Sequence, residues 1–205
     1  MKDTTRITDP YIWVVDNLIS VRQCSAIIKK FEKNIDQTHQ GVIGDADSPR
    51  VDTQVKNSRD LVMTNKNGWE RQDKLFHSLV SSMLSNYCEH LKSAGGYESY
   101  TTGEMYYCLP YGINDEYKDT GYQIQKTEPG KGYVWHNDFS PSRVMTFIIY
   151  LNDVEEGWTQ FYNGDQISPR AGRGVIFPAT WTYVHQGYPP KQTKYLATGW
   201  LHSEL

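Results

Sequence analysis

Three residues in the C-terminal half of the chain offer the donor atoms of a metal site. His136 and Asp138 stand two positions apart in GYVWHNDFS, and His185 follows in WTYVHQG. Side chains on a strand alternate in direction, so His136 and Asp138 point the same way across Asn137. Two imidazoles and one carboxylate, with three positions left open, form the facial triad of non-haem Fe(II) oxygenases. The same donors also suit Zn(II) and Mn(II) on ligand type alone.

A histidine two positions before an acidic residue has little weight by itself. With 6 His and 24 acidic residues in 205 positions, about one such match arises by chance. His202-Ser203-Glu204 is a second match in this chain. We interpret His202, His39 in a polar loop, and His77 and His90 on a helical pattern as solvated or hydrogen-bonded side chains rather than ligands.

A basic residue placed after His185 adds a further element. Lys194 opens KYLATGW, in which Lys194, Thr198 and Trp200 share one strand face. If that face lines a barrel, the ammonium lies in a mostly apolar interior, where it is costly unless an anion pairs with it. The alternative is a solvated lysine at a strand edge. Tyr150, at the end of the strand pattern RVMTFIIY, could offer its hydroxyl to the same anion.

The patterns along the chain predict the elements that would position these residues. YIWVV (11–15) indicates a short strand, and the capping-box spacing Ser20–Gln23 begins an amphipathic helix over 20–34. A polar loop over 38–67 contains one candidate strand near 59–63, and a second amphipathic helix covers 69–92. After residue 96 the pattern predicts eight short strands at 102–108, 121–127, 133–136, 143–151, 158–162, 174–178, 182–186 and 193–202.

Two helices followed by eight short strands predict an α+β, mainly β fold. We expect a jelly-roll barrel with the helices packed on one sheet. Because the chain has no repeat, low-complexity tract or linker, we expect one domain over 1–205. In this division, 1–95 supplies helical support and a loop, and 96–205 supplies the β core.

The net charge, the cysteines and the apolar runs of the chain indicate which partners and which location to expect. A net charge of −3 and a pI near 6.1 give no electrostatic reason to expect nucleic acid or an anionic membrane as partner. The three cysteines lack a C-x-x-C spacing, which favours free thiols in a reducing compartment. No apolar run reaches transmembrane length, and the polar N-terminus does not resemble a signal peptide. We therefore expect a cytoplasmic protein.

Five segments, in this order, resemble the 2-oxoglutarate/Fe(II)-dependent oxygenases and most closely their prolyl 4-hydroxylase-like branch. They are KTEPGKGYVWHND, RVMTFIIYLND, GWTQF, PRAGRGVIFPA and a histidine followed nine residues later by lysine. The resemblance covers roughly residues 121–201. It implies a double-stranded β-helix, which agrees with the jelly roll predicted from the strand count.

The resemblance also implies roles for individual residues. It assigns His136, Asp138 and His185 to Fe(II), and it places Lys194 and Tyr150 on the distal carboxylate of 2-oxoglutarate, with Thr198 nearby. The implied cofactor is Fe(II), the implied co-substrates are 2-oxoglutarate and O2, and ascorbate is a further candidate. The implied reaction hydroxylates an unactivated C–H, with a peptidyl proline as the candidate substrate, and releases succinate and CO2. The presence of Asp138 argues against the halogenating variant of the family, which lacks this carboxylate.

Two positions depart from the family pattern. Thr127 stands where many members have a tyrosine that contacts 2-oxoglutarate, and Glu156-Gly157 replaces the usual Gly-Gly. The first change concerns one co-substrate contact and the second a turn conformation. Neither removes a metal ligand.

Two other functions fit part of this pattern. One is a jelly-roll binding module of cupin or lectin type, in which a metal is structural and exposed aromatic residues hold the ligand. Such a module gives no reason for an inward lysine at a fixed distance after the distal histidine. The second is a nucleic-acid demethylase of the same fold, which the acidic balance and the lack of a basic stripe disfavour.

Overall fold

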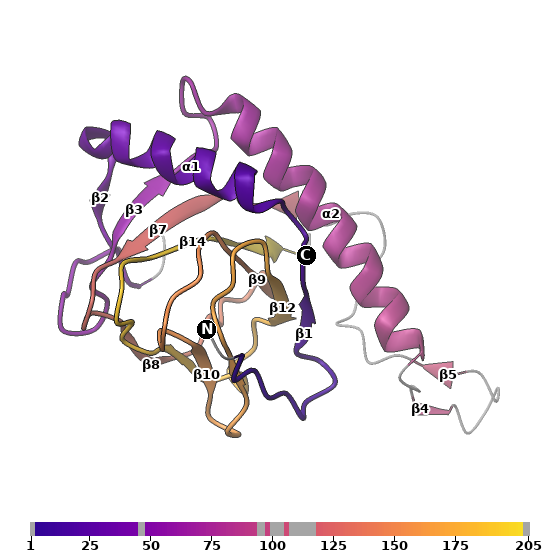
Figure 1. The fold of residues 1–205 in the computed structure, drawn as a ribbon. Helices are drawn as coiled ribbons and strands as arrows, with labels where there is room; N and C mark the ends of the chain where they lie inside the picture. Colours follow the sequence, from indigo (N-terminus) through magenta and orange to yellow (C-terminus); the bar gives the residue numbers. More distant parts are fainter. Residues whose placement is uncertain (1–2, 45–47, 94–96, 99–104, 107–117, 203–205) are drawn as a thin grey trace.

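The computed structural model describes residues 3–44, 48–93, 97–98, 105–106 and 118–202. The predicted strand 102–108 falls largely outside them, as do Cys108 and most of the polar segment 109–120. Within that stretch, β5 (Met105–Tyr106) pairs with β4 (Tyr97–Glu98). Elsewhere the described strands form two antiparallel sheets, with the helices against the larger one (Figure 1).

The larger sheet carries the long strands of the fold. Its order is β1-β12-β9-β14-β7-β3-β2, with β6 paired to β14, and all its pairs are antiparallel. Its central strands β9 and β12 are almost fully buried, since they are covered on both faces. The strands are β1 (Trp13–Val15), β2 (His39–Gln40), β3 (Arg59–Val62), β6 (Lys118–Asp119), β7 (Gln123–Thr127), β9 (Arg143–Tyr150), β12 (Gly174–Pro178) and β14 (Lys194–His202).

The smaller sheet lies on the side opposite the helices (Figure 1). Its order is β11-β10-β13-β8, from β8 (Tyr133–His136), β10 (Thr159–Phe161), β11 (Gln166–Ile167) and β13 (His185–Gly187). Apolar side chains from both sheets, including Ile148, Phe161 and Leu196, form one buried cluster. This is the predicted jelly-roll architecture, mainly β with helices on one sheet.

The two helices cover the outer face of the larger sheet. Helix α1 (Val21–Lys33) begins at Ser20, whose hydroxyl accepts from the Gln23 amide, so the predicted capping box is confirmed. Helix α2 (Glu70–Ser93) buries a stripe that includes Phe76 and Tyr87. Each such side chain contributes about 1.5–3 kcal/mol on burial. Among the described residues, no helix has the length and apolarity needed to cross a membrane.

Strand boundaries differ from the prediction mainly where strands are very short. Strands β2, β6 and β11 have two residues each, too few to show an alternating pattern in the sequence. The expected strand 182–186 begins only at His185, because Tyr183 donates its amide to the Thr180 carbonyl in a turn. That turn places His185 at the start of its strand, facing the end of β8.

Candidate active site

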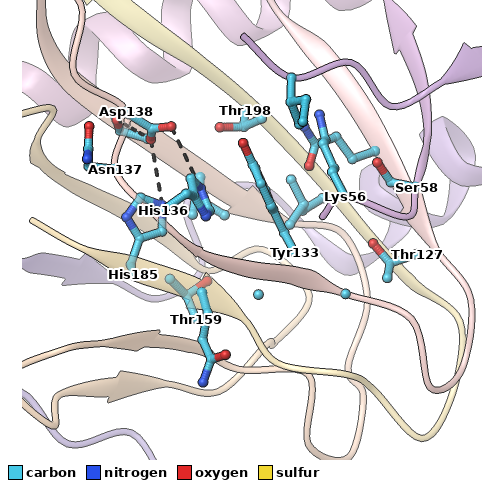
Figure 2. A pocket seen from close by; sticks show the side chains of 18 of the residues that line it. Lys56, Ser58, Thr127, Tyr133, His136, Asn137, Asp138, Thr159, His185 and Thr198 are labelled. Carbon is cyan, nitrogen blue, oxygen red and sulfur yellow. Dashed lines mark hydrogen bonds and ion pairs between the residues drawn. The ribbon is translucent and has the colours of Figure 1, made fainter. Parts of the chain in front are cut away.

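His136, Asp138 and His185 converge at one end of the smaller sheet (Figure 2). His136 ends β8, His185 begins β13, and the two are direct antiparallel partners. Nε2 of His136 lies 3.9 Å from Oδ1 of Asp138, and Nε2 of His185 lies 3.7 Å from Oδ2. One donor atom from each residue lies within 4.8 Å of the other two. Such spacing suits an ion with bonds of about 2.0–2.2 Å.

The backbone orients both imidazoles in the same way. Nδ1 of His136 lies 2.7 Å from the Val134 carbonyl, and Nδ1 of His185 lies 2.9 Å from the Tyr183 carbonyl. A carbonyl only accepts, so each Nδ1 carries a hydrogen, and in the neutral ring the lone pair is then on Nε2. This tautomer presents both Nε2 atoms to the carboxylate and to an ion beside it.

The charge states of His136 and Asp138 also suit a divalent cation. Burial, together with a smaller effect of the neighbouring His185, lowers the pKa of His136 to about 3. Burial alone would raise the pKa of Asp138, but His185 and hydrogen bonds from the Thr146 hydroxyl, at 2.8 Å from Oδ2, and from the Trp200 side chain hold it below its usual range. The carboxylate is therefore anionic beside a neutral His136, and a cation would compensate its charge.

The three donors open into a cavity of about 200 Å³ between the sheets. Ile148 and Leu196 give it an apolar wall, and Lys194, Thr159 and Thr198 line it with polar atoms. It has the mixed lining of a small-molecule site, although its volume is small for one. The metal donors and the predicted co-substrate lysine thus share one space.

Lys194 lines this cavity, and its ammonium has one hydrogen-bond partner among the described residues. Its side chain is 3% exposed, and its ammonium donates to the Gly157 carbonyl at 2.7 Å. Burial lowers the pKa of Lys194 to about 8. Among the described residues no carboxylate lies within ion-pair distance of it. A buried ammonium with one carbonyl partner fits the carboxylate of a small ligand, so the predicted inward orientation is confirmed.

The other two predicted co-substrate residues lie nearby but are already engaged. The Tyr150 hydroxyl is 2.6 Å from the Thr159 hydroxyl, and Tyr150 itself does not line the cavity. Thr198 lines it but donates its hydroxyl hydrogen to the Phe147 carbonyl at 2.6 Å. Thr159 is therefore the hydroxyl that faces the cavity here, with Tyr150 behind it.

The two departures from the family pattern have local consequences. Thr127 lines the cavity and is the cross-strand partner of Lys194, and it is much shorter than the tyrosine of many family members. Glu156 and Gly157 both adopt positive φ, at 62° and 64°, and a Cβ on Gly157 would lie 2.7 Å from Cβ of Pro190. The turn thus forms with glutamate in the first position and aims the Gly157 carbonyl at Lys194.

Tyr133 belongs to the site although strand alternation would turn it away from His136. Across from the interval His185–Gly187, β8 has one extra residue, so the pairing carries a bulge. Val134 and Trp135 both face outward, and Tyr133 and His136 both face the cavity. The Tyr133 ring stacks on the His136 ring at 3.4 Å between centroids and 12° between planes.

Two buried nitrogens at this end of the larger sheet, Nε of Arg143 and Nε2 of His202, have no hydrogen-bond partner among the described residues. The Trp200 side chain lies beside Asp138 and helps to lower the pKa of that carboxyl. The Arg143 guanidinium lies 3.9 Å from the Trp200 ring centroid, and both residues line the cavity. His202 pairs with Arg143 across the strands and bonds Ser142 through Nδ1. Arg143 begins β9, and Trp200 and His202 lie in the last three residues of β14.

The remaining histidines lie away from the metal donors, as predicted. Nδ1 of His77 is 3.0 Å from Asp119, and His39 contacts the Gln40 carbonyl. The His90 ring lies against Trp13. The aromatic residues that a lectin-like module would use also lie outside the cavity lining, namely Trp135, Trp158, Trp181 and Tyr188.

Comparisons with known proteins agree with this geometry. Residues 122–202 match the family model of the 2OG-Fe(II) oxygenase superfamily. No curated protein matches the sequence. A prolyl hydroxylase from Trichoplax adhaerens, solved with a hypoxia inducible factor peptide, has a similar structure, with a TM-score of 0.69 and 17% identity over 94% of this chain and 84% of that one.

Two further solved structures are similar. A Pseudomonas putida prolyl-4-hydroxylase has a TM-score of 0.64 and 13% identity, covering 94% of this chain and 93% of its own. A viral collagen prolyl hydroxylase from Paramecium Bursaria Chlorella virus-1, in a 2OG complex, has a TM-score of 0.59 and 19% identity, covering 95% and 97%. The fold is thus that of these prolyl hydroxylases, and residues 122–202 are similar to the 2OG-Fe(II) oxygenase superfamily.

Proposed function

We propose that this protein is a 2OG-Fe(II) oxygenase that hydroxylates a proline in a peptide or protein and converts 2-oxoglutarate to succinate and CO2. The observation that carries the proposal is one cavity that holds both the candidate metal donors and Lys194, whose buried ammonium has no carboxylate partner among the described residues. A binding module with a structural metal would need only the first of these. An enzyme that binds a dicarboxylic acid beside its metal needs both.

In this proposal His136, Asp138 and His185 hold Fe(II) through two Nε2 atoms and one carboxylate oxygen. When bound, the iron together with 2-oxoglutarate and O2 supplies the oxidising chemistry. The protein keeps His136 neutral, and the Val134 and Tyr183 carbonyls aim the two Nε2 atoms. Thr146 holds one Asp138 oxygen through a hydrogen bond. These contacts preorganise the donors before the ion binds.

Lys194 binds the distal carboxylate of 2-oxoglutarate in this proposal. The Gly157 carbonyl fixes the position of the ammonium, and a carboxylate in the cavity would gain a charge-assisted hydrogen bond from it. Thr159, backed by the Tyr150 hydroxyl, offers a second polar contact on the same wall. The apolar side chains of Ile148 and Leu196 exclude water around the carbon chain of the co-substrate.

Arg143 and Trp200 support a peptide as the primary substrate. Both residues line the cavity, and Nε of Arg143 is a buried donor without a hydrogen-bond partner among the described residues. Such a donor costs free energy, which a peptide carbonyl would recover. The flat Trp200 ring also suits a pyrrolidine ring. The solved relative from Trichoplax adhaerens binds a peptide of hypoxia inducible factor.

Two finer points belong to the same proposal. Ascorbate is proposed as a reductant that supports turnover. A reducing, cytoplasmic location is proposed because Cys24 is a buried thiol outside any disulfide.

The test is an assay of the purified chain with Fe(II), 2-oxoglutarate and a library of proline-containing peptides. We expect succinate, and a product heavier by one oxygen atom whose fragmentation places the oxygen on proline. Asp138→Ala should abolish both. Succinate with oxygen on another residue or on a small molecule would overturn the proline assignment alone. If metal and 2-oxoglutarate bind but no succinate forms under any condition, the binding-module alternative stands.

A further inference from the structure

A second buried lysine borders the cavity, and it is paired. Nζ of Lys56 lies 2.7 Å from Oδ2 of Asp60, and their side chains are 6% and 1% exposed. Replacing such a buried pair by well-packed apolar side chains of similar volume is often neutral or stabilising. The free energy of unfolding therefore gives no reason for an ion pair at this position. The specific contacts of Lys56 and Asp60 need another explanation.

The chain around Lys56 joins the two sheets. The Val134 amide donates to the Val55 carbonyl at 3.0 Å, and the Asn57 amide donates to the Gly132 carbonyl at 2.9 Å, so this segment lies along the free edge of β8. Immediately afterwards β3 pairs with β7 of the larger sheet. Lys56 thus stands at the seam between the sheets, beside the cavity.

The Lys56 ammonium has three N–H groups and makes three contacts. One reaches Asp60, whose other oxygen accepts from the Ser58 hydroxyl at 2.8 Å. A second approaches the Val42 carbonyl at 3.4 Å. The ammonium also lies 5.6 Å from the centroid of the Tyr133 ring, within cation–π range. One side chain therefore contacts three separate elements.

The segment that contains Val42 forms part of the cavity wall. Val42, Ile43 and Gly44 line the cavity, and the Gly41 amide donates to the Ser58 carbonyl at 2.8 Å. A Cβ on Gly41 would lie 2.5 Å from Oγ of Ser58 and 3.1 Å from Cε of Lys56. The segment therefore packs directly on the Lys56 side chain, with no room for a larger residue.

Strand β8, which contains Tyr133, connects Lys56 to the candidate metal donor His136. Figure 2 shows the Tyr133 side chain between Lys56 on one side and His136 on the other. Its ring stacks on His136 at 3.4 Å, and the imidazole is held from its other end by the Val134 carbonyl. A shift of Lys56 would therefore be transmitted through one aromatic ring to a metal donor.

We propose that Lys56 is a positioning residue. With Asp60 it holds the cavity-covering segment 41–44 in place and presses Tyr133 against His136. It thereby couples the cover of the cavity to the orientation of a metal donor. Its effect on turnover rests on the proposed function, whereas its effects on the segment and on the metal site do not.

The test uses a double variant, Lys56→Met with Asp60→Leu, which removes both charges and leaves no buried carboxylate unpaired. We expect the variant to fold and the amides of Gly41 and Ile43 to exchange roughly tenfold faster than in the parent. The visible spectrum of the Co(II)-substituted protein should change without 2-oxoglutarate present. The affinity for 2-oxoglutarate with Mn(II) should stay within about threefold, because Lys194 is untouched.

Two comparisons make the result specific. Arg59→Met, on the exposed face of the same strand, should leave exchange and the Co(II) spectrum as in the parent. Gly41→Ala keeps both charges but displaces the segment from Lys56, so it should accelerate exchange at Ile43 and alter the spectrum. This second variant decides the question if the double variant fails to fold.

Parental exchange rates and a parental Co(II) spectrum in both variants would overturn the proposal. For turnover, we expect the double variant to raise KM for the primary substrate by roughly tenfold while kcat changes less. A parent protein that forms no succinate would refute the proposed function. The exchange and Co(II) measurements would still decide the role of Lys56 in that case.

Discussion

Two buried cations in this protein, Arg173 and Lys194, have opposite surroundings. Both side chains are 3% exposed. The Arg173 guanidinium donates to both carboxylate oxygens of Asp3 and of Asp16, and also to Thr5 and to the Ser168 carbonyl. Lys194 donates to one carbonyl. These contacts raise the pKa of Arg173 even though burial opposes this, whereas burial lowers that of Lys194 to about 8.

The difference separates a structural charge from a binding charge. Arg173 holds the N-terminal segment to the barrel and has no donor left for a ligand. Lys194 has unused donors that point into a cavity shared with the metal site. Two carboxylates differ in the same way. Asp165 accepts hydrogen bonds from Thr8, Asp9 and Asn163, whereas Asp138 faces two histidines and accepts from the Thr146 hydroxyl. Burial alone would not have told the two classes apart.

The largest expected effect comes from the binding carboxylate. Asp138→Ala should reduce the affinity for Co(II) or Mn(II) by about 100-fold or more, because it removes the only charged donor of the three. Succinate formation should fall below detection. Titration calorimetry with Mn(II) measures the first effect. Asp16→Ala, at the structural cluster, serves as control and should retain metal affinity; equal losses in both variants would break the distinction.

Lys194→Met should next remove most of the affinity for 2-oxoglutarate. We expect a loss of about 50- to 100-fold, since a charge-assisted contact is worth about 1.5–3 kcal/mol. The melting temperature without ligand should stay the same or rise, because the variant no longer buries an unpaired ammonium. Calorimetry with Mn(II) and 2-oxoglutarate, alongside thermal unfolding, measures both. Unchanged affinity would remove Lys194 from the site.

Arg173→Met should show the reverse pattern. Its carboxylate partners Asp3 and Asp16 are partly exposed, which softens the cost of breaking the cluster. We expect a loss of about 2–4 kcal/mol in the free energy of unfolding with unchanged affinity for 2-oxoglutarate. Urea unfolding and the same calorimetry provide the comparison with Lys194→Met. A stable variant with weakened co-substrate binding would contradict the structural role.

The smallest effect is a pH dependence that only the binding cation should cause. With a pKa of about 8 in the free protein, Lys194 is charged below that pH and increasingly neutral above it. Binding a carboxylate then requires proton uptake, so Kd for 2-oxoglutarate should rise above pH 8, by at most about tenfold per pH unit. Lys194→Arg should give a flat profile up to pH 10. A flat profile in the parent would contradict the shifted pKa.

The same shift predicts a stability effect with a definite sign. The unfolded chain keeps the Lys194 proton to higher pH than the folded chain does. Between about pH 8 and the ordinary lysine pKa, the unfolded state therefore binds more protons. The contribution of this group to stability accordingly rises with pH in that window. Below pH 8 its burial penalty is fully present.

Much of the fold and the pairing of His136 with Asp138 could be predicted because their signals are local. The capping box at Ser20, the helical stripe of α2 and the alternating strands depend on spacings of two to four residues. His136 and Asp138 lie on one side of the chain for the same reason. His185 and Lys194 required the resemblance in addition, because nothing local says which distant histidine joins the pair.

The remaining parts of the site depend on contacts between distant segments. The bulge in β8 arises from its pairing with β13, and it brings Tyr133 to the face of His136 against the simple alternation of the strand. Lys56 enters the cavity wall because its segment pairs with β8 from the other edge. Neither the pairing of β8 with β13 nor that of the Lys56 segment with β8 produces a periodic pattern of residues in the sequence.

The sequence by itself determined the donor types, their order and the strands beside which they lie, since these depend on side-chain chemistry and short-range periodicity. Tertiary structure decided which polar groups are satisfied and which are free. Arg173, Lys56 and Lys194 are all buried cations, but the first two meet carboxylates and the third meets a single carbonyl. That outcome depends on which strands pack together, and it separates the charges that hold the fold from the charge left for a ligand.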